Sequence, residues 1–385
     1  MDLAPRKDSM ETLVRGYVAP GFGPVADAFR SNFDERGERG AACTLIMEGV
    51  TVVDICGEQA SDQIAWTEAT RCVAFSVSKG ITAICLLMAA DKGLLDLDSP
   101  VAAYWPEFGV HGKDHVTVRQ VLAHRAGLPS PDRKLSMHDL EGWFPVVDAL
   151  AGQAPLWEPN SAFAYHPVTV GFLAGEVLRR ATGLRPAEWL AKHVSTPLGL
   201  DTTYGSSPDA RGLARVLPYA AFGDGVPLSA EDQALMERSM LMDCAYGPDI
   251  FTSANTRDLL GPESPAVNVV SSARDLARLF GATVSHVEGV RLLSAGEVEE
   301  ATRPLSSGKP FIGPDKGDIW GTGFMLHSRR RLMAGPGSFG HDGAAGQLAF
   351  AQPSSGLGFA YQTTLPGGPE DTRAEVLSAA VRRCL

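Results

Sequence analysis

Ser76 and Lys79 have the residue types and the spacing that nucleophilic catalysis requires. Residues three apart share one face of a helix, so the hydroxyl and the amine would be neighbours. A serine in a first helical turn lies near unpaired N–H groups at the positive end of the helix dipole, which favours a developing oxyanion. A lysine in apolar surroundings has a lowered pKa, and its neutral amine can accept the serine proton. The sequence therefore predicts a serine nucleophile with a lysine base.

The Ser-x-x-Lys pattern alone is weak evidence, because Ser306 and Lys309 repeat it between Gly and Pro in a predicted loop. The first copy differs in its context, since it opens the most hydrophobic predicted helix in the chain. A structural alternative remains open at this point, in which Ser76 caps the helix and Lys79 extends its amine to water.

Other catalytic motifs are absent from the sequence. It contains no HExxH, no paired CxxC, no P-loop and no GxSxG. Its single GxGxxG (335–340) precedes a His-Asp-Gly turn and not a helix, which argues against dinucleotide binding. We therefore expect neither a metal nor a cofactor.

The elements that must position these residues follow from periodicity and turn residues. The run 76–93 has a helical apolar period through Ile81, Ile84, Cys85 and Met88. Two β-branched runs within 43–56 meet at Glu48-Gly49, which predicts a hairpin. The remaining predicted helices are 10–33, 117–127, 168–183, 185–195, 271–284 and 368–385. The remaining predicted strands are 319–326, 331–334, 346–353 and 357–364, the last two linked by a turn at 353–356.

Strands near both termini and helices between them predict an α+β fold with two domains. Residues 1–95 and 265–385 would form a discontinuous α/β domain with an antiparallel sheet, and 96–264 a mostly helical insertion. The segment 201–262 is loop-rich and is expected to form a lid. A site at the seam between the domains is the default expectation.

Four segments, in this order, resemble a known superfamily. FSVSKGITA (75–83) resembles the serine motif of serine β-lactamases and penicillin-binding proteins, and TVRQVLAHRAGLP (117–129) resembles the LLxHxxG stretch of the class C branch. FAYHPVTVGFLAGEVLRRATG (163–183) resembles the tyrosine motif of family VIII carboxylesterases. GHDGAAGQ (340–347) stands where the superfamily has its Lys-Thr-Gly strand, and 271–280 resembles the helix before it. The resemblance spans about residues 10–385 and implies a β-lactamase/transpeptidase-like fold, with an antiparallel sheet flanked by helices.

The resemblance also implies roles for individual residues. Ser76 would be the acylated nucleophile, and Lys79 and Tyr165 would share the general acid-base work, with Lys79 favouring a Tyr165 phenolate. The oxyanion hole would consist of the N–H groups of Ser76 and Ala344, the latter following Gly343. Pocket walls are expected from three aromatic residues, Trp157, Trp320 and Phe251. We expect His124 to be structural.

Two departures from the superfamily pattern bear on the substrate. Pro167 stands where the tyrosine motif often has an Asn that contacts an acyl amide. His341 and Asp342 replace the Lys and Thr that receive a carboxylate in β-lactamases, and a neutral histidine beside an aspartate weakens an anion site. We therefore expect a serine carboxylesterase for uncharged, short-chain esters. The alternatives are a β-lactamase or D-Ala-peptide hydrolase, a statin-type acyltransferase, and a non-catalytic ligand-binding protein.

Composition limits the partners. The 385 residues carry a formal charge of −11, which disfavours nucleic acid and anionic lipid. The longest apolar run (81–90) is half of the roughly 20 residues that a membrane span needs. Six scattered cysteines and the absence of a secretory pattern predict a cytoplasmic protein that acts on a small-molecule ester. The basic run 329–331 is expected to be a solvated turn, and the sequence leaves the oligomeric state open.

Overall fold

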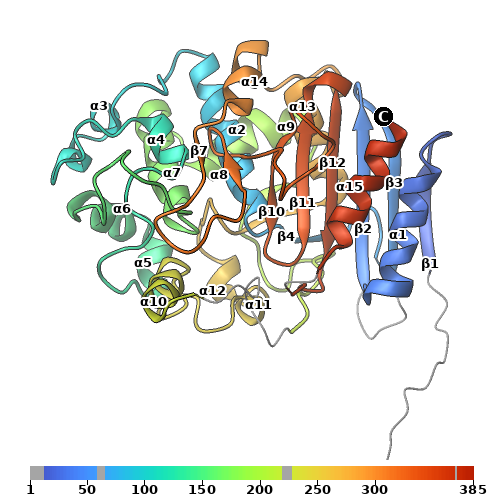
Figure 1. Ribbon diagram of the computed structural model, residues 1–385, viewed down its shortest axis with the longest axis horizontal. Coiled ribbons are helices and arrows are strands. Elements are labelled where there is room, and N and C mark those ends of the chain that lie inside the picture. The colour runs from blue at the N-terminus through green and yellow to red at the C-terminus, as the bar shows by residue number, and fades with distance from the viewer. Residues whose placement is uncertain (1–12, 59–65, 219–227, 369–370) are drawn as a thin grey trace, which may run out of the picture.

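The computed structural model describes residues 13–58, 66–218, 228–368 and 371–385, and it confirms the α+β class (Figure 1). Its main sheet has nine antiparallel strands in the order β1-β3-β2-β12-β11-β10-β9-β8-β7. These are β1 (Leu13–Val18), β2 (Gly40–Met47), β3 (Val50–Glu58), β7 (Ser306–Ser307), β8 (Ile319–Trp320), β9 (Met325–Leu326), β10 (Phe339–Gly343), β11 (Gln347–Gln352) and β12 (Leu357–Thr363). A smaller sheet joins β4 (Arg71–Val73), β6 (Val269–Ser272) and β5 (Thr203–Tyr204).

The centre of the main sheet joins the two ends of the chain. Strand β2 pairs with β12, Leu45 lying opposite Phe359. Both predicted links between neighbouring strands are confirmed. Glu48 and Gly49 have φ values of 49° and 82°, which is the left-handed pair that a tight two-residue hairpin requires. A short 3-10 turn, Pro353–Ser355, joins β11 to β12.

Helices cover both faces of the sheet. On one face, α1 (Gly23–Arg36) packs against α15 (Arg373–Cys384), and their apolar residues form a core with those of the sheet. On the other face, α13 (Ala273–Val284) packs against β12, β2 and β11, and α2 (Val77–Asp91) packs against β10. Figure 1 shows most of the remaining helices beyond the β10 side of the sheet.

The remaining helices are mostly short and connect the motifs. They are α3 (Val101–Tyr104), α4 (Val118–Leu122), α5 (Met137–Gly142), α6 (Phe144–Gly152), α7 (Thr169–Thr182), α8 (Pro186–Leu190), α9 (Thr196–Leu198), α10 (Ala230–Ser239), α11 (Ile250–Ser253), α12 (Arg257–Leu260) and α14 (Ala295–Thr302), with a 3-10 turn at Pro106–Gly109 and a π-helical turn at Ala191–Ser195. In the part of the chain that the structure describes, no helix is long and apolar enough to cross a membrane.

The predicted helices 76–93, 168–183, 271–284 and 368–385 are confirmed as α2, α7, α13 and α15. The predicted helix 117–127 contains only the five-residue α4, and the predicted strand 319–326 is the short antiparallel pair β8 and β9. The predicted helix 10–33 is strand β1 followed by α1, because Leu13–Val18 pairs along β3 and the Pro20-Gly21 turn separates the two elements. The predicted strand 331–334 is a turn. The segment 201–262, predicted to be loop-rich, contains α10 to α12, while its residues 219–227 lie outside the described residues.

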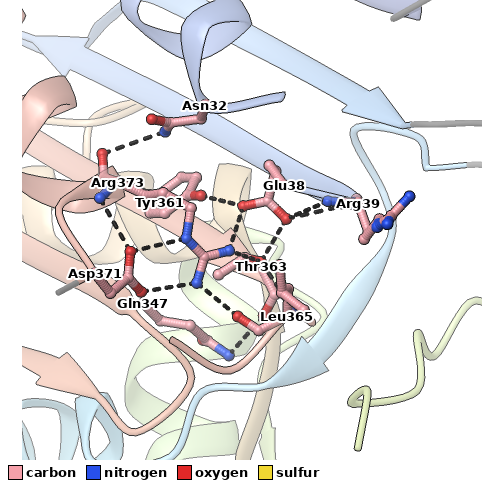
Figure 2. A network of polar contacts seen from close by, with 10 residues as sticks. Asn32, Glu38, Arg39, Gln347, Tyr361, Thr363, Leu365, Asp371 and Arg373 are labelled. Carbon is pink, nitrogen blue, oxygen red and sulfur yellow. Dashed lines mark hydrogen bonds and ion pairs between the residues drawn. The ribbon is translucent and has the colours of Figure 1, made fainter. Parts of the chain in front are cut away.

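A buried ion pair links Glu38, which follows α1, to Arg373, the first residue of α15. The Arg373 guanidinium lies 2.8 Å from Glu38 Oε2, and their side chains are 2% and 0% exposed. Figure 2 shows that Tyr361 and Thr363 of β12 donate hydrogen bonds to the same carboxylate, while Asp371 lies 2.8 Å from the other side of the guanidinium. Each buried charge therefore has several partners, as a charge away from water requires.

We expect Arg373→Met to lower the free energy of unfolding by about 3–5 kcal/mol, because it leaves the Glu38 carboxylate buried without its cation. Urea unfolding followed by circular dichroism measures this change. Arg30→Met is the matched control, since Arg30 is 53% exposed and its pair with Asp27 is worth at most about 1 kcal/mol. Equal unfolding midpoints for the two variants would contradict the prediction.

Candidate active site

The structure brings Ser76, Lys79 and Tyr165 together around one oxygen atom. Lys79 Nζ lies 3.0 Å from Ser76 Oγ, and the Tyr165 hydroxyl donates a 2.8 Å hydrogen bond to the same oxygen. Lys79 Nζ also lies 4.9 Å from the centre of the Tyr165 ring. All three groups are therefore within the reach that proton transfer to or from Ser76 needs.

Ser76 stands at the N-cap of α2, but its side chain caps nothing. A helix-capping serine would accept a hydrogen bond from a backbone N–H one turn later, and this Oγ instead faces Lys79 and Tyr165. The preceding residue, Phe75, is buried at a φ of 47°, an uncommon backbone conformation for a bulky residue. Such conformations persist where the surrounding structure enforces them, often at functional sites. The capping alternative for Ser76 is therefore not what the structure shows.

Lys79 is buried and does not extend to water. Only 4% of the residue is exposed, and Nζ donates a 2.8 Å hydrogen bond to the carbonyl of Ala266. Burial lowers the pKa of Lys79 well below its ordinary value of 10.5, and the negative charge of Asp342 offsets only part of that shift. The neutral amine that a general base requires is thus favoured at this position.

The protonation state of Tyr165 differs from the one expected from the sequence, in which Lys79 favours the phenolate. Burial raises the pKa of Tyr165 above its ordinary value of 10.0, against the opposing effect of its hydrogen bond to Ser76. The site therefore pairs a lysine that is readily neutral with a tyrosine that keeps its proton. Such a tyrosine is suited to donating a proton first and not to accepting one.

The turn after β10 reaches the start of α2. A Cβ added to Gly343 would stand 2.6 Å from the carbonyl oxygen of Ala74, so only glycine permits this close approach. Gly343, Ala344 and Ser76 line the same pocket. Gln347, which opens β11, donates a 2.7 Å hydrogen bond to the carbonyl of Val73 and fixes the turn from its other end.

Ser76 opens into a pocket of about 660 Å³. This volume lies in the range of ordinary small-molecule sites. Trp320 and Phe251 contribute to its walls, as predicted. Further apolar residues of the wall include Phe163, Met236, Met240, Ile312 and Met325.

Two predicted site residues lie outside this pocket. Trp157 is not among the lining residues, and its ring instead packs 4.6 Å from the ring of Phe311. His341 is 1% exposed and lies behind the wall, its ring 6.0 Å from that of Tyr165. Burial lowers the pKa of His341, which keeps it neutral, and its Nε2 has no hydrogen-bond partner.

The basic run 329–331 was predicted to be a solvated turn, but all three arginines line the pocket. Arg331 forms an ion pair with Asp342, and Arg330 lies 3.0 Å from Asp318. Burial by itself would raise the pKa of Asp342, but Arg331 holds that pKa well below 3.8. The negative charge that the sequence placed beside His341 is therefore compensated by a cation. In the sequence, the only sign that residues 329–331 belong to the site was the run of three basic residues.

The segment 201–262, predicted to form a lid, supplies residues that periodicity did not single out. Met236 and Met240, at the end of α10, line the pocket together with Phe251 of α11. Within the described ranges, no group of three or more His, Cys, Asp and Glu could hold a metal ion.

Comparison with known proteins agrees with this geometry. Residues 25–382 match the beta-lactamase family model. The esterase/beta-lactamase LipL of Mycobacterium tuberculosis is 31% identical over 358 residues, which are 90% of this chain and 82% of LipL. A family VIII carboxylesterase of known structure superposes with a TM-score of 0.86 at 33% identity, covering 97% of this chain and all of that one. A penicillin-binding protein homologue from Caulobacter crescentus superposes with a TM-score of 0.83 at 30% identity, again over 97% of this chain and all of the other.

The family match covers nearly the whole chain, and the resemblance inferred from the four motifs is confirmed by it. The superposition over 97% of this chain shows that the whole fold is shared with the family VIII carboxylesterase. The chain therefore belongs to the beta-lactamase family and is a hydrolase of the esterase/beta-lactamase fold.

Proposed function

We propose that this protein hydrolyses short-chain carboxylic esters through an acyl-enzyme on Ser76. One observation carries the proposal: Ser76 Oγ lies within hydrogen-bond distance of both Lys79 and Tyr165 at the wall of the pocket. The esterase relatives support the ester as the substrate class.

In the proposed acylation, the neutral Lys79 amine takes the Ser76 proton while Ser76 Oγ attacks the ester carbonyl carbon. The N–H groups of Ser76 and Ala344 stabilise the oxyanion, a contribution worth about 10²–10³ in kcat for each donor. Tyr165 gives its proton to the departing alkoxide. The products of this step are the alcohol, the acyl-enzyme, a Tyr165 phenolate and a Lys79 ammonium.

Deacylation reverses these roles. The Tyr165 phenolate takes a proton from water as the water attacks the acyl carbon, and Ser76 leaves with the proton that Lys79 held. The ammonium 4.9 Å from the Tyr165 ring stabilises the phenolate between the two steps. The carboxylic acid is released, and all three residues regain their starting protonation states.

The pocket favours an uncharged substrate of modest size. Its lining includes aromatic and methionine side chains, Pro167 has no side-chain donor, and His341 places no cation in the pocket. Of the cations that do line the pocket, Arg330 and Arg331 are paired with Asp318 and Asp342. We also propose the division into a sheet domain (1–95 and 265–385) and a helical domain (96–264). On this division, Tyr165 meets Ser76 and Lys79 at the seam.

A cytoplasmic location is part of the proposal. All six cysteines are free, and four of them are buried. Burial raises the pKa of Cys43, Cys72 and Cys85, which disfavours the reactive thiolate. Unpaired thiols of this kind are typical of a reducing compartment.

The direct test is an acyl adduct. The protein is incubated with p-nitrophenyl butyrate, quenched in acid, digested and analysed by mass spectrometry. We expect one butyryl group on the peptide that contains Ser76. Turnover of this ester with no label on Ser76 would contradict the proposed mechanism.

One observation favours a second candidate function, β-lactam hydrolysis. The cationic residues Lys316 and Arg329 line the pocket, where they could meet a substrate carboxylate. We expect hydrolysis of p-nitrophenyl butyrate to exceed that of nitrocefin in kcat/KM. The reverse order would favour a β-lactamase. Transfer of the butyryl group to added alcohols would favour an acyltransferase, and no reaction with either compound would favour a binding protein.

A further inference from the structure

We propose that His124 is the residue that positions Tyr165 for catalysis. This inference rests on the proposed esterase function and extends it to a residue that the sequence indicated only as structural. His124 contacts both neighbours of Tyr165 in the chain, Ala164 and His166.

The backbone on each side of Tyr165 is hydrogen-bonded to His124. The N–H of Ala164 donates to the His124 carbonyl at 3.2 Å, and the N–H of His166 donates to His124 Nδ1, also at 3.2 Å. Tyr165 therefore lies between two backbone groups that are anchored on one residue. A rotation of this segment would break at least one of the two hydrogen bonds.

The ring of His124 also holds the Tyr165 ring. The two ring centres are 5.1 Å apart in an edge-to-face contact, and Trp320 stacks on Tyr165 at 5.2 Å. His124 and Trp320 are themselves in contact at 4.8 Å. These contacts fix the direction in which the phenol points toward Ser76 Oγ.

An unusual backbone turn makes this double contact possible. His124 follows α4 and has a φ of 61°, a left-handed conformation that few residues other than glycine adopt. This turn directs both the carbonyl and the ring of His124 toward the 164–166 segment. His124 is 2% exposed, and burial lowers the pKa of His124 well below 6.5, which favours the neutral ring. Because the N–H of His166 donates to Nδ1, the single proton of that neutral ring belongs on Nε2.

A substitution series separates the acceptor from the backbone strain. His124→Ala removes the Nδ1 acceptor and the ring, and we expect kcat for p-nitrophenyl butyrate to fall about 10²-fold, a loss typical of a displacement near 1 Å. KM should change much less than kcat, because His124 itself does not line the pocket and most of the lining is untouched. His124→Asn places an oxygen close to Nδ1 and should recover most of kcat. His124→Gly relieves the strain of the left-handed backbone but supplies no acceptor, so it should not recover kcat.

A double-mutant cycle shows whether His124 acts through Tyr165. If it does, His124→Ala should cost less than about threefold in a Tyr165→Phe background, because the misplaced hydroxyl is already absent. Single-turnover acylation with excess enzyme, followed by intact-mass spectrometry, keeps the slow variants measurable. His193→Asn is the control, since His193 packs on Trp189 outside the pocket and should leave kcat unchanged.

Each outcome decides the matter. A similar loss with or without the Tyr165 hydroxyl, a recovery by His124→Gly equal to that by His124→Asn, or an unchanged kcat in His124→Ala would overturn the inference. If circular dichroism shows that His124→Ala does not fold, His124→Gln is used instead. The glutamine amide reaches the position of the histidine Nε2 and not that of Nδ1, so the same loss of kcat is expected. Activity that survives Ser76→Ala would instead overturn the proposed function.

Discussion

Ser76→Ala is expected to reduce kcat for p-nitrophenyl butyrate by about 10⁴-fold or more. Without Oγ there is no atom that can carry the acyl group, and Lys79 and Tyr165 lose the oxygen that both contact. The pocket and the backbone N–H groups remain, so the residual rate should be that of water attack on a bound ester. Initial rates of p-nitrophenol release measure the effect.

The control for this variant is Ser207→Ala, an exposed serine outside the pocket, which should keep wild-type activity. Ser76→Ala should still unfold in one cooperative transition with only a small change in midpoint, because Ser76 Oγ caps no helix and its loss removes only the contacts to Lys79 and Tyr165. A kcat within tenfold of the wild-type value would show that another residue is the nucleophile.

Lys79→Met is expected to lower kcat/KM by about 10³–10⁴-fold, comparable to the loss of a general base in related serine mechanisms. Methionine keeps the apolar stem of the side chain but cannot accept the Ser76 proton. Lys79→Arg should fail as well, because a guanidinium stays charged at any working pH. The exposed Lys309, from the second Ser-x-x-Lys, provides the control Lys309→Met.

The wild-type enzyme should show the corresponding pH dependence. The active form has a neutral Lys79, and burial lowers the pKa of Lys79. Below that pKa the amine is protonated and inactive, so kcat/KM should rise with pH and reach a plateau well below pH 10.5. An ascending limb centred near the ordinary lysine pKa, or one that persists in Lys79→Met, would show that Lys79 is not the base.

The features that were predictable from sequence are local ones. Helix α2, with Ser76 at its start and Lys79 one turn later, follows from apolar periodicity and the Gly93 stop. The β2–β3 hairpin follows from Glu48-Gly49. Tyr165 has no such local signature, and only the family resemblance pointed to it.

The features that were missed depend on contacts between distant segments. Strand β1 exists because β3 lies beside it, and a short run such as Leu13–Val18 is ambiguous without that partner. Arg331 meets Asp342 only when the loop that connects β9 to β10 has folded. His124 acts on a segment some forty residues away, and nothing in the spacing of the two reveals that a left-handed turn aims its ring there.

The pairing of β2 with β12 has a consequence for how the chain is made. Glu38 leaves the ribosome long before Arg373, which follows 335 residues later, so the nascent protein holds three of the nine strands of its central sheet (β1, β3 and β2) without the neighbour β12. During that interval the free edge of β2 is a template for unwanted pairing with other chains. Late closure of this kind slows folding and exposes intermediates to aggregation, so the yield of native protein on expression should depend on temperature and on chaperones.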